Sequence, residues 1–302
     1  MNEVASALLQ LGLQKDDKIA IVSNNRPEWN FLDLGMMQIG VVNVPVYPTI
    51  SEDDYKYILN DARVKLVFVS DENLFQKVKK IKSSVPSLSD IYSFNKISGV
   101  KNFDGDFLSL AKVDEDKIKI ESIKNSISEN DLSCLIYTSG TTGFPKGVML
   151  IHRNVVENLK ASKPFVPVGK KHCALSFLPL NHSFEKLIIY LYIMCGVSVY
   201  YAESIDTIGD NLKEVKPHVF TAVPRLLEKV FEKIMAKGNE LTGIKRKLFF
   251  WAIALGKKYD TQKRGSFFYR LQLFIANKII FSKWREALGG NTICIVSGSA
   301  PL

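Results

Sequence analysis

The chain has 302 residues, 46% of them hydrophobic, which is enough to bury the core of one large domain or two smaller ones. Its formal net charge is +9, but residues 239–290 alone contain eleven Lys or Arg residues against three acidic residues. The remainder is therefore almost neutral. This distribution argues against a protein that binds nucleic acid over its whole surface.

The four cysteines, at positions 134, 173, 195 and 294, are scattered and include no CxxC pair. Their apolar, strand-like surroundings predict buried thiols in a reducing compartment. The first residues, 1–4, show neither the basic segment nor the long apolar segment of a secretory signal peptide. We therefore expect a cytoplasmic protein, peripheral at most to the inner face of a membrane.

Short β-branched runs alternate with helical patterns along the chain. Pro27 and Glu28 suit the first turn of a helix, and Ser51 with Asp54 resembles a capping box in which Asp replaces Glu. Residues 94–131 are rich in Ser, Lys, Asp and Asn, and we expect a surface connection there. The alternation predicts an α/β fold of stacked, mostly parallel sheets flanked by helices. The predicted strands lie at 18–22, 41–46, 65–70, 132–136, 174–178, 197–201, 218–223 and 292–296, and the predicted helices at 27–40, 51–62, 72–82 and 224–237.

One uncharged apolar stretch, the sixteen residues 187–202, is slightly too short for a bilayer span. Gly196 interrupts it, and the β-branched run 197–201 follows. A buried helix that stops at a glycine and leads into a core strand explains this pattern better than a membrane span does.

The most informative stretch is Tyr137-Thr-Ser-Gly-Thr-Thr-Gly-Phe-Pro-Lys-Gly-Val148, here called the signature loop. It directly follows the predicted strand 132–136. Its glycines and hydroxyl groups can surround phosphate oxygens, and Lys146 adds a positive charge. It is not a Walker A motif, because Lys146 stands between Pro145 and Gly147. Composition alone would also fit a flexible turn.

The signature loop resembles the phosphate-binding signature of the adenylate-forming enzymes, which include acyl-CoA synthetases, peptide-synthetase adenylation domains and luciferases. The order of the matching blocks is most similar to long-chain fatty-acid–CoA ligases, and nearly the whole chain takes part. The other blocks that resemble this family are Asn24-Asn-Arg-Pro-Glu-Trp29, Val44-Pro-Val-Tyr-Pro-Thr49, Tyr57-Ile-Leu-Asn-Asp61, Leu178-Pro-Leu-Asn-His-Ser-Phe-Glu185, Val223-Pro-Arg-Leu-Leu-Glu-Lys229 and Ser297-Gly-Ser-Ala-Pro-Leu302.

The resemblance implies ATP-dependent activation of a fatty acid to an acyl-adenylate, from which coenzyme A then displaces AMP. ATP, Mg²⁺ and coenzyme A as co-substrate are the cofactors it implies. An aryl-CoA ligase, a peptide-synthetase adenylation domain and a non-catalytic acyl- or nucleotide-binding remnant remain alternatives. No His/Cys/Asp/Glu cluster has the spacing of a metal site, so Mg²⁺ is expected to arrive with ATP.

The expected chemistry gathers negative charge on the departing pyrophosphate, which fixed donors can stabilise. The resemblance implies that Lys146, Thr141 and His182 are catalytic. Small side chains at Ser299 and Ala300 are expected to make room for the acyl chain and adenine. The predicted phosphate-binding residues are Thr138, Ser139, Gly140, Thr141, Thr142 and Gly143, together with Lys146.

His182 has two interpretations. The resemblance implies that it lines the acyl or adenylate pocket, where a neutral imidazole can donate to a carboxylate or phosphate oxygen. Alternatively it caps a helix, together with Asn181 and Ser183. One side chain can do both. Asn181 stands where many long-chain ligases have Ser or Phe, and this changes the expected polarity of the pocket.

The resemblance also implies parts that 1–302 does not contain. After the block that resembles residues 297–302, sequences of this family contain a Tyr-Gly-x-Thr-Glu block that stacks on adenine and helps to hold Mg²⁺. An aspartate that binds the ribose, a hinge, and a mobile C-terminal lid domain with a lysine for adenylation follow. Relatives also begin some tens of residues earlier. We therefore expect an incomplete N-terminal AMP-binding domain that alone makes no acyl-CoA and binds ATP weakly.

The basic segment, residues 239–290, interleaves its cations with ten Phe, Tyr and Trp residues. Helices that carry both kinds of residue suit an anionic membrane surface. An ordinary helical hairpin, with aromatics in the core and lysines in water, is the other interpretation. The sequence leaves both open.

Overall fold

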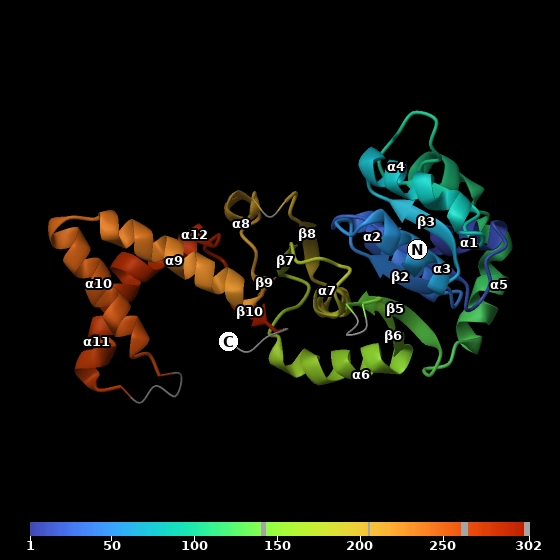
Figure 1. Cartoon of the computed structure of the whole chain (residues 1–302). Helices are drawn as coiled ribbons and strands as arrows, with labels where there is room; N and C mark the ends of the chain where they lie inside the picture. The colour runs from blue at the N-terminus through green and yellow to red at the C-terminus, as the bar shows by residue number, and fades with distance from the viewer. Residues whose placement is uncertain (140–142, 205, 261–264, 299–302) are drawn as a thin grey trace. The chain divides into compact units, whose positions relative to one another are not determined.

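The computed structural model describes residues 1–139, 143–204, 206–260 and 265–298. The chain forms two compact units, each with its own sheet (Figure 1). The first unit contains Met1–Phe165 and Leu178–Leu191, and the second contains Val166–Phe177 and Tyr192–Leu302. The mostly parallel sheets flanked by helices confirm the predicted fold class.

The sheet of the first unit has six strands in the order β4-β3-β1-β2-β5-β6. The first five run parallel, and β6 pairs antiparallel with β5. The signature loop therefore connects the two strands of a β-hairpin. Every residue of β2 is buried, as expected for a parallel strand covered on both faces. The strands are β1 (Lys18–Val22), β2 (Val42–Val46), β3 (Val64–Val69), β4 (Asp90–Ser93), β5 (Leu132–Thr138) and β6 (Lys146–Ile151).

Helices cover this sheet in two groups: α1 packs against α2 and α5, and α3 packs against α4 (Figure 1). The chain crosses the sheet in one direction through α2, from β1 to β2, and in the opposite direction through α3 and α4, from β2 to β3 and then β4. Because crossovers between parallel strands are right-handed, the two groups of helices lie on opposite faces of the sheet. The predicted capping box is confirmed, since Ser51 Oγ accepts from Asp54 N (3.1 Å). The helices are α1 (Asn2–Gln10), α2 (Pro27–Met37), α3 (Glu52–Asp61), α4 (Glu72–Ile81), α5 (Val113–Ser126) and α6 (His152–Ser162).

Residues 94–131 are more than a surface connection, and that expectation was wrong. They include α5 and a π-helical turn, Phe103–Phe107, whose two terminal side chains are buried. The Phe107 ring lies 5.0 Å from Phe68 and 5.5 Å from Tyr92. Because the segment is polar in composition, the burial of Phe103 and Phe107 was not predicted from the sequence.

The second unit has a parallel sheet in the order β10-β9-β7-β8, and a group of helices lies between β9 and β10 along the chain. The predicted helix at 224–237 is confirmed as α9. The strands are β7 (Cys173–Ser176), β8 (Ser198–Tyr201), β9 (Val219–Ala222) and β10 (Cys294–Ser297), and the helices are α8 (Ile208–Val215), α9 (Pro224–Glu240), α10 (Gly243–Lys257), α11 (Phe267–Ala276), the π-helical Asn277–Phe281 and α12 (Ser282–Ala287).

The long apolar stretch folds into the predicted helix α7 (Ser183–Cys195), a glycine stop and strand β8. The prediction of a core strand was wrong, because β8 is an edge strand of its sheet and its residues are exposed or half-buried. Gly196 has φ +74°, the left-handed conformation that ends many helices. No helix in the described part of the chain is both long and apolar enough to cross a bilayer.

A buried carboxylate on α2 joins three elements of the first unit. Asp33 is fully buried, and its two oxygens accept from Lys186 Nζ on α7 at 2.9 and 3.0 Å. Asn43 of β2 donates to Oδ1 (2.5 Å), and the Tyr190 hydroxyl donates to Oδ2. Lys186 also lies 4.9 Å above the Trp29 ring. Burial and the Asp33 carboxylate raise the pKa of Tyr190, so this hydroxyl stays a donor.

We expect Asp33→Ala to lower the free energy of unfolding by about 3–5 kcal/mol, because it leaves the Lys186 ammonium buried without its counter-charge. Urea denaturation followed by circular dichroism measures this change. The control is Glu52→Ala, which removes an exposed ion pair with Lys80 and should cost less than about 1 kcal/mol. Equal losses in the two variants would contradict the assignment.

Candidate functional site

A cavity of about 500 Å³ lies at the carboxyl ends of β2 and β5 in the first unit. Ligands of α/β sheets bind at this edge, and the volume is typical of a small-molecule site. One part of its wall is apolar and the other polar. The apolar part includes Pro45, Val46, Ile50, Ile58 and Ile136, and the polar part includes Thr138, Ser139, His182 and Ser183.

The cavity opens where the pairing of β2 with β5 stops. These strands pair at Asn43 and Cys134, and Pro45, two positions further along β2, has no N–H to donate. The carbonyl oxygen of the next residue, Val46, accepts from Asn181 Nδ2 (2.6 Å). A side chain from the loop before α7 is therefore bonded to the backbone at the end of β2.

Part of the signature loop reaches this cavity. Thr138, Ser139 and Gly143 line it. Gly143 has φ +92°, and a Cβ atom there would meet no atom of the described residues within 4 Å. Lys146 is exposed at the start of β6, in register with Thr138, and does not line the cavity.

Five of the predicted site residues lie outside the described residues. They are Gly140, Thr141 and Thr142 of the signature loop and Ser299 and Ala300 near the end of the chain.

His182 both caps α7 and lines the cavity. It precedes the helix, and its Nδ1 accepts from Phe184 N (3.2 Å), which is the bond of an N-cap residue. With Nδ1 as acceptor, the neutral imidazole carries its proton on Nε2. Asn181 is 1% exposed and directed to the Val46 carbonyl, so it adds no polar group to the cavity wall.

Two contacts that the sequence did not reveal tie the hairpin to α3. Phe144 stacks on Tyr57, with ring centroids 5.2 Å apart, and the Tyr137 hydroxyl donates to Asp61 Oδ2 (2.5 Å). Burial and this hydrogen bond raise the pKa of Tyr137. Gly147 lies beside it, and an added Cβ there would be only 3.1 Å from the Tyr137 ring, a tight contact that the ring would have to shift to relieve. Both blocks were recognised as family-like, but no local pattern showed that they meet.

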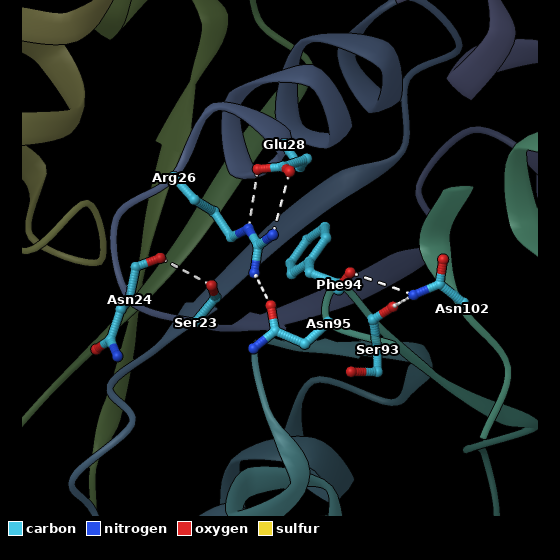
Figure 2. Close-up of polar contacts among 8 residues, drawn as sticks. All are labelled: Ser23, Asn24, Arg26, Glu28, Ser93, Phe94, Asn95 and Asn102. Atoms are coloured by element: carbon cyan, nitrogen blue, oxygen red, sulfur yellow. Dashed lines mark hydrogen bonds and ion pairs between the residues drawn. The ribbon is translucent and has the colours of Figure 1, made fainter. Parts of the chain in front are cut away.

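Another part of the same sheet edge has a structural role (Figure 2). The Arg26 guanidinium donates to both carboxylate oxygens of Glu28 (2.9 and 3.1 Å) and to Asn95 Oδ1 (2.9 Å), and lies 4.9 Å from the Phe94 ring centre. The hydrogen bonds from Arg26 lower the pKa of Glu28. The charge of Arg26 is thus already balanced within the protein.

Comparison with known proteins identifies the family. The sequence matches the family of AMP-binding enzymes over residues 1–299, and the chain belongs to this family. It is 32% identical over 312 residues to the human long-chain-fatty-acid–CoA ligase ACSBG2, an alignment that covers 99% of this chain and 46% of that protein. The long-chain-fatty-acid–CoA ligase FadD15 of Mycobacterium tuberculosis is also 32% identical, over 99% of this chain and 50% of its own length. The chain spans about half the length of these curated relatives.

Solved structures show the same fold. The inhibitor-bound N-terminal domain of FACL13 from Mycobacterium tuberculosis superposes with a TM-score of 0.62 at 23% identity, over 75% of this chain and 55% of that one. The long-chain-fatty-acid-CoA ligase FadD1 from Archaeoglobus fulgidus superposes with a TM-score of 0.62 at 19% identity, over 78% of this chain and 45% of that one. The fold is that of the N-terminal domain of adenylate-forming enzymes.

The contact between Phe144 and Tyr57 should hold the signature loop in place. We expect Tyr57→Ala to speed amide hydrogen exchange in β6 about 2- to 10-fold, because an aromatic pair contributes about 0.5–1.5 kcal/mol. Exchange in β1 should not change. The control is Phe31→Ala, which removes another half-exposed ring, on α2. Protection of β6 that is the same in all three proteins would show that the stack does not hold the hairpin.

Proposed function

We propose that this chain provides the ATP-binding part of a fatty-acid–CoA ligase. One observation carries the proposal: Thr138, Ser139 and Gly143 of the signature loop share a single cavity with His182, which comes from a distant block. Membership of the AMP-binding family and relatives that are long-chain-fatty-acid–CoA ligases support it. The triphosphate of ATP binds at the loop, and the fatty-acid carboxylate reacts beside His182.

In the proposed first step, a carboxylate oxygen attacks the α-phosphorus of ATP and pyrophosphate leaves. The thiol of coenzyme A then attacks the acyl-adenylate, and AMP leaves. Hydroxyl and N–H donors of Thr138 and Ser139, with the charge of Lys146, stabilise the leaving pyrophosphate more than the bound ATP. The Nε2–H of His182 donates to a carboxylate or phosphate oxygen. The apolar wall at Pro45 limits access of water.

The described residues fit a phosphate group better than a metal ion bound by protein alone. A Cβ at Gly143 would meet no described atom within 4 Å, and Thr138 and Ser139, which line the same cavity, are exposed residues with hydroxyl groups. Among the described residues, no group of three or more His, Cys, Asp or Glu side chains is placed to hold a metal. We therefore propose that Mg²⁺ enters with the phosphates of ATP.

Carboxylate-dependent ATP–pyrophosphate exchange tests this function in a version of the protein extended to the full length of its relatives. Long-chain fatty acids should support exchange. Exchange with aryl acids or amino acids instead would favour an aryl-CoA ligase or a peptide-synthetase adenylation domain. If no acid supports exchange, the chain is a binding module.

In the same assay, Lys146→Ala should slow exchange about 100-fold or more, as for removal of one transition-state donor. The matched control is Lys160→Ala, which removes an exposed lysine of α6 that pairs with Glu157. An unchanged rate in a folded Lys146→Ala protein would remove this lysine from the mechanism.

We also propose that the basic segment, residues 239–290, contacts the anionic inner face of a membrane from the cytoplasm. On α11, Phe267, Phe268 and Phe274 are 76%, 74% and 66% exposed, and exposed Arg270 and Lys278 lie close to them in the sequence. Aromatic side chains can enter the interface while cations face anionic lipid. The helical-hairpin interpretation accounts for buried Phe249 and for the packing of α10 against α11, but not for the exposed rings of Phe267, Phe268 and Phe274.

Vesicle sedimentation tests this surface. The bound fraction should rise with anionic lipid and fall with salt. Replacing both Phe267 and Phe268 by Ser should weaken binding at least about tenfold, because two large apolar side chains no longer leave water. Ile118→Ser, at an exposed position on α5, is the control. Equal recovery in the supernatant with and without anionic vesicles would rule out the contact.

A further inference from the structure

The amide of Asn25 bridges the loop that precedes His182. Asn25 follows β1, and its Nδ2 donates to Leu178 O (2.7 Å), 153 residues away in sequence. Its Oδ1 accepts from Leu180 N (3.1 Å). Both ends of one planar amide are thus bonded to the backbone of the same loop, which sets the position and direction of that loop.

The remaining contacts of the loop extend this hold to His182. Asn181, the next residue, is buried and donates to Val46 O at the end of β2 (2.6 Å). His182 N donates to Pro179 O (3.0 Å), which closes the turn. The His182 ring then accepts from Phe184 N through Nδ1 (3.2 Å) and lines the cavity.

We propose that Asn25 is a positioning residue for His182: it holds the loop so that the imidazole keeps its Nε2–H tautomer at the cavity wall. This inference rests on the proposed function for its link to ATP, but the positioning itself is a property of the chain alone. Asn25 touches the loop backbone and acts through His182. Asp at this position would keep the acceptor for Leu180 N–H and lose the donor to Leu178 O.

The neighbouring residue Arg26 provides a contrast at the same sheet edge. Its side chain is bonded to Glu28 and Asn95 and lies over Phe94, as Figure 2 shows. Like Asn25, Asn95 makes a side-chain hydrogen bond at this edge of the sheet, but its partner is the Arg26 side chain and not the loop before His182. Asn95→Ala is therefore a matched control for Asn25→Ala.

Nitrogen-15 NMR of the imidazole rings tests the positioning in the whole chain. The protein has four histidines, and His182→Gln assigns the signal of His182. In the unchanged protein and in Asn95→Ala, His182 should be mainly the Nε2–H tautomer. In Asn25→Ala its two nitrogen shifts should move toward those of a tautomer mixture, with a smaller movement in Asn25→Asp. His182 shifts that stay the same in both Asn25 variants would overturn the proposal.

Affinity for MgATP, measured by phosphorus-31 NMR, provides a second readout. Asn25→Ala should bind about tenfold more weakly, comparable to the loss of one hydrogen bond to a charged ligand. If Asn25 acts through His182, the double variant Asn25→Ala/His182→Gln binds no more weakly than His182→Gln alone. Additive losses would show that Asn25 acts on the ligand by another route and would overturn the proposal. If the unchanged chain binds no MgATP, the proposed function fails, and the imidazole spectra still decide the positioning.

Discussion

The buried carboxylate of Asp33 is the interaction on which the site depends most. A charged group that is buried away from water is tolerated only when protein groups supply its hydrogen bonds. For Asp33 these donors are Lys186 and Tyr190 of α7 and Asn43 of β2. Lys186 is one helical turn after His182, whose carbonyl oxygen accepts from Lys186 N (3.2 Å). Lys186, which balances the charge of Asp33, is therefore linked through the first turn of α7 to the backbone of His182.

The cavity itself results from an interruption in the sheet. A proline in β2 ends the ladder toward β5, and the loop before α7 supplies a side-chain amide to the backbone there. Asn25 and Asn181 use the same chemistry, since each hydrogen-bonds backbone groups through its side-chain amide. Side-chain amides thus fix the backbone at the end of β2 and in the loop that leads to His182.

Most of the framework could be predicted from local patterns. Alternating strand and helix signals, the Ser51–Asp54 capping box and the stop at Gly196 all depend on neighbours in sequence. The segment 94–131 was misinterpreted because its composition is polar, although Phe103 and Phe107 bury themselves. The loop was recognised from its residues, but its ties to α3 and the bridge from Asn25 were not. Those contacts join residues far apart in the chain, and no local spacing encodes them. The roles assigned to Thr141, Ser299 and Ala300 remain predictions.

Paramagnetic broadening by MnATP tests most directly whether the cavity between β2 and β5 receives the phosphates. In the amide spectrum of the deuterated chain, the signals of Thr138, Ser139, Gly143 and Ser183 should broaden first. Those of Lys18 and Val64, which begin their strands at the opposite edge of the same sheet, should stay sharp. Broadening centred on another surface, or equal broadening at both edges, would contradict the placement of the ATP site.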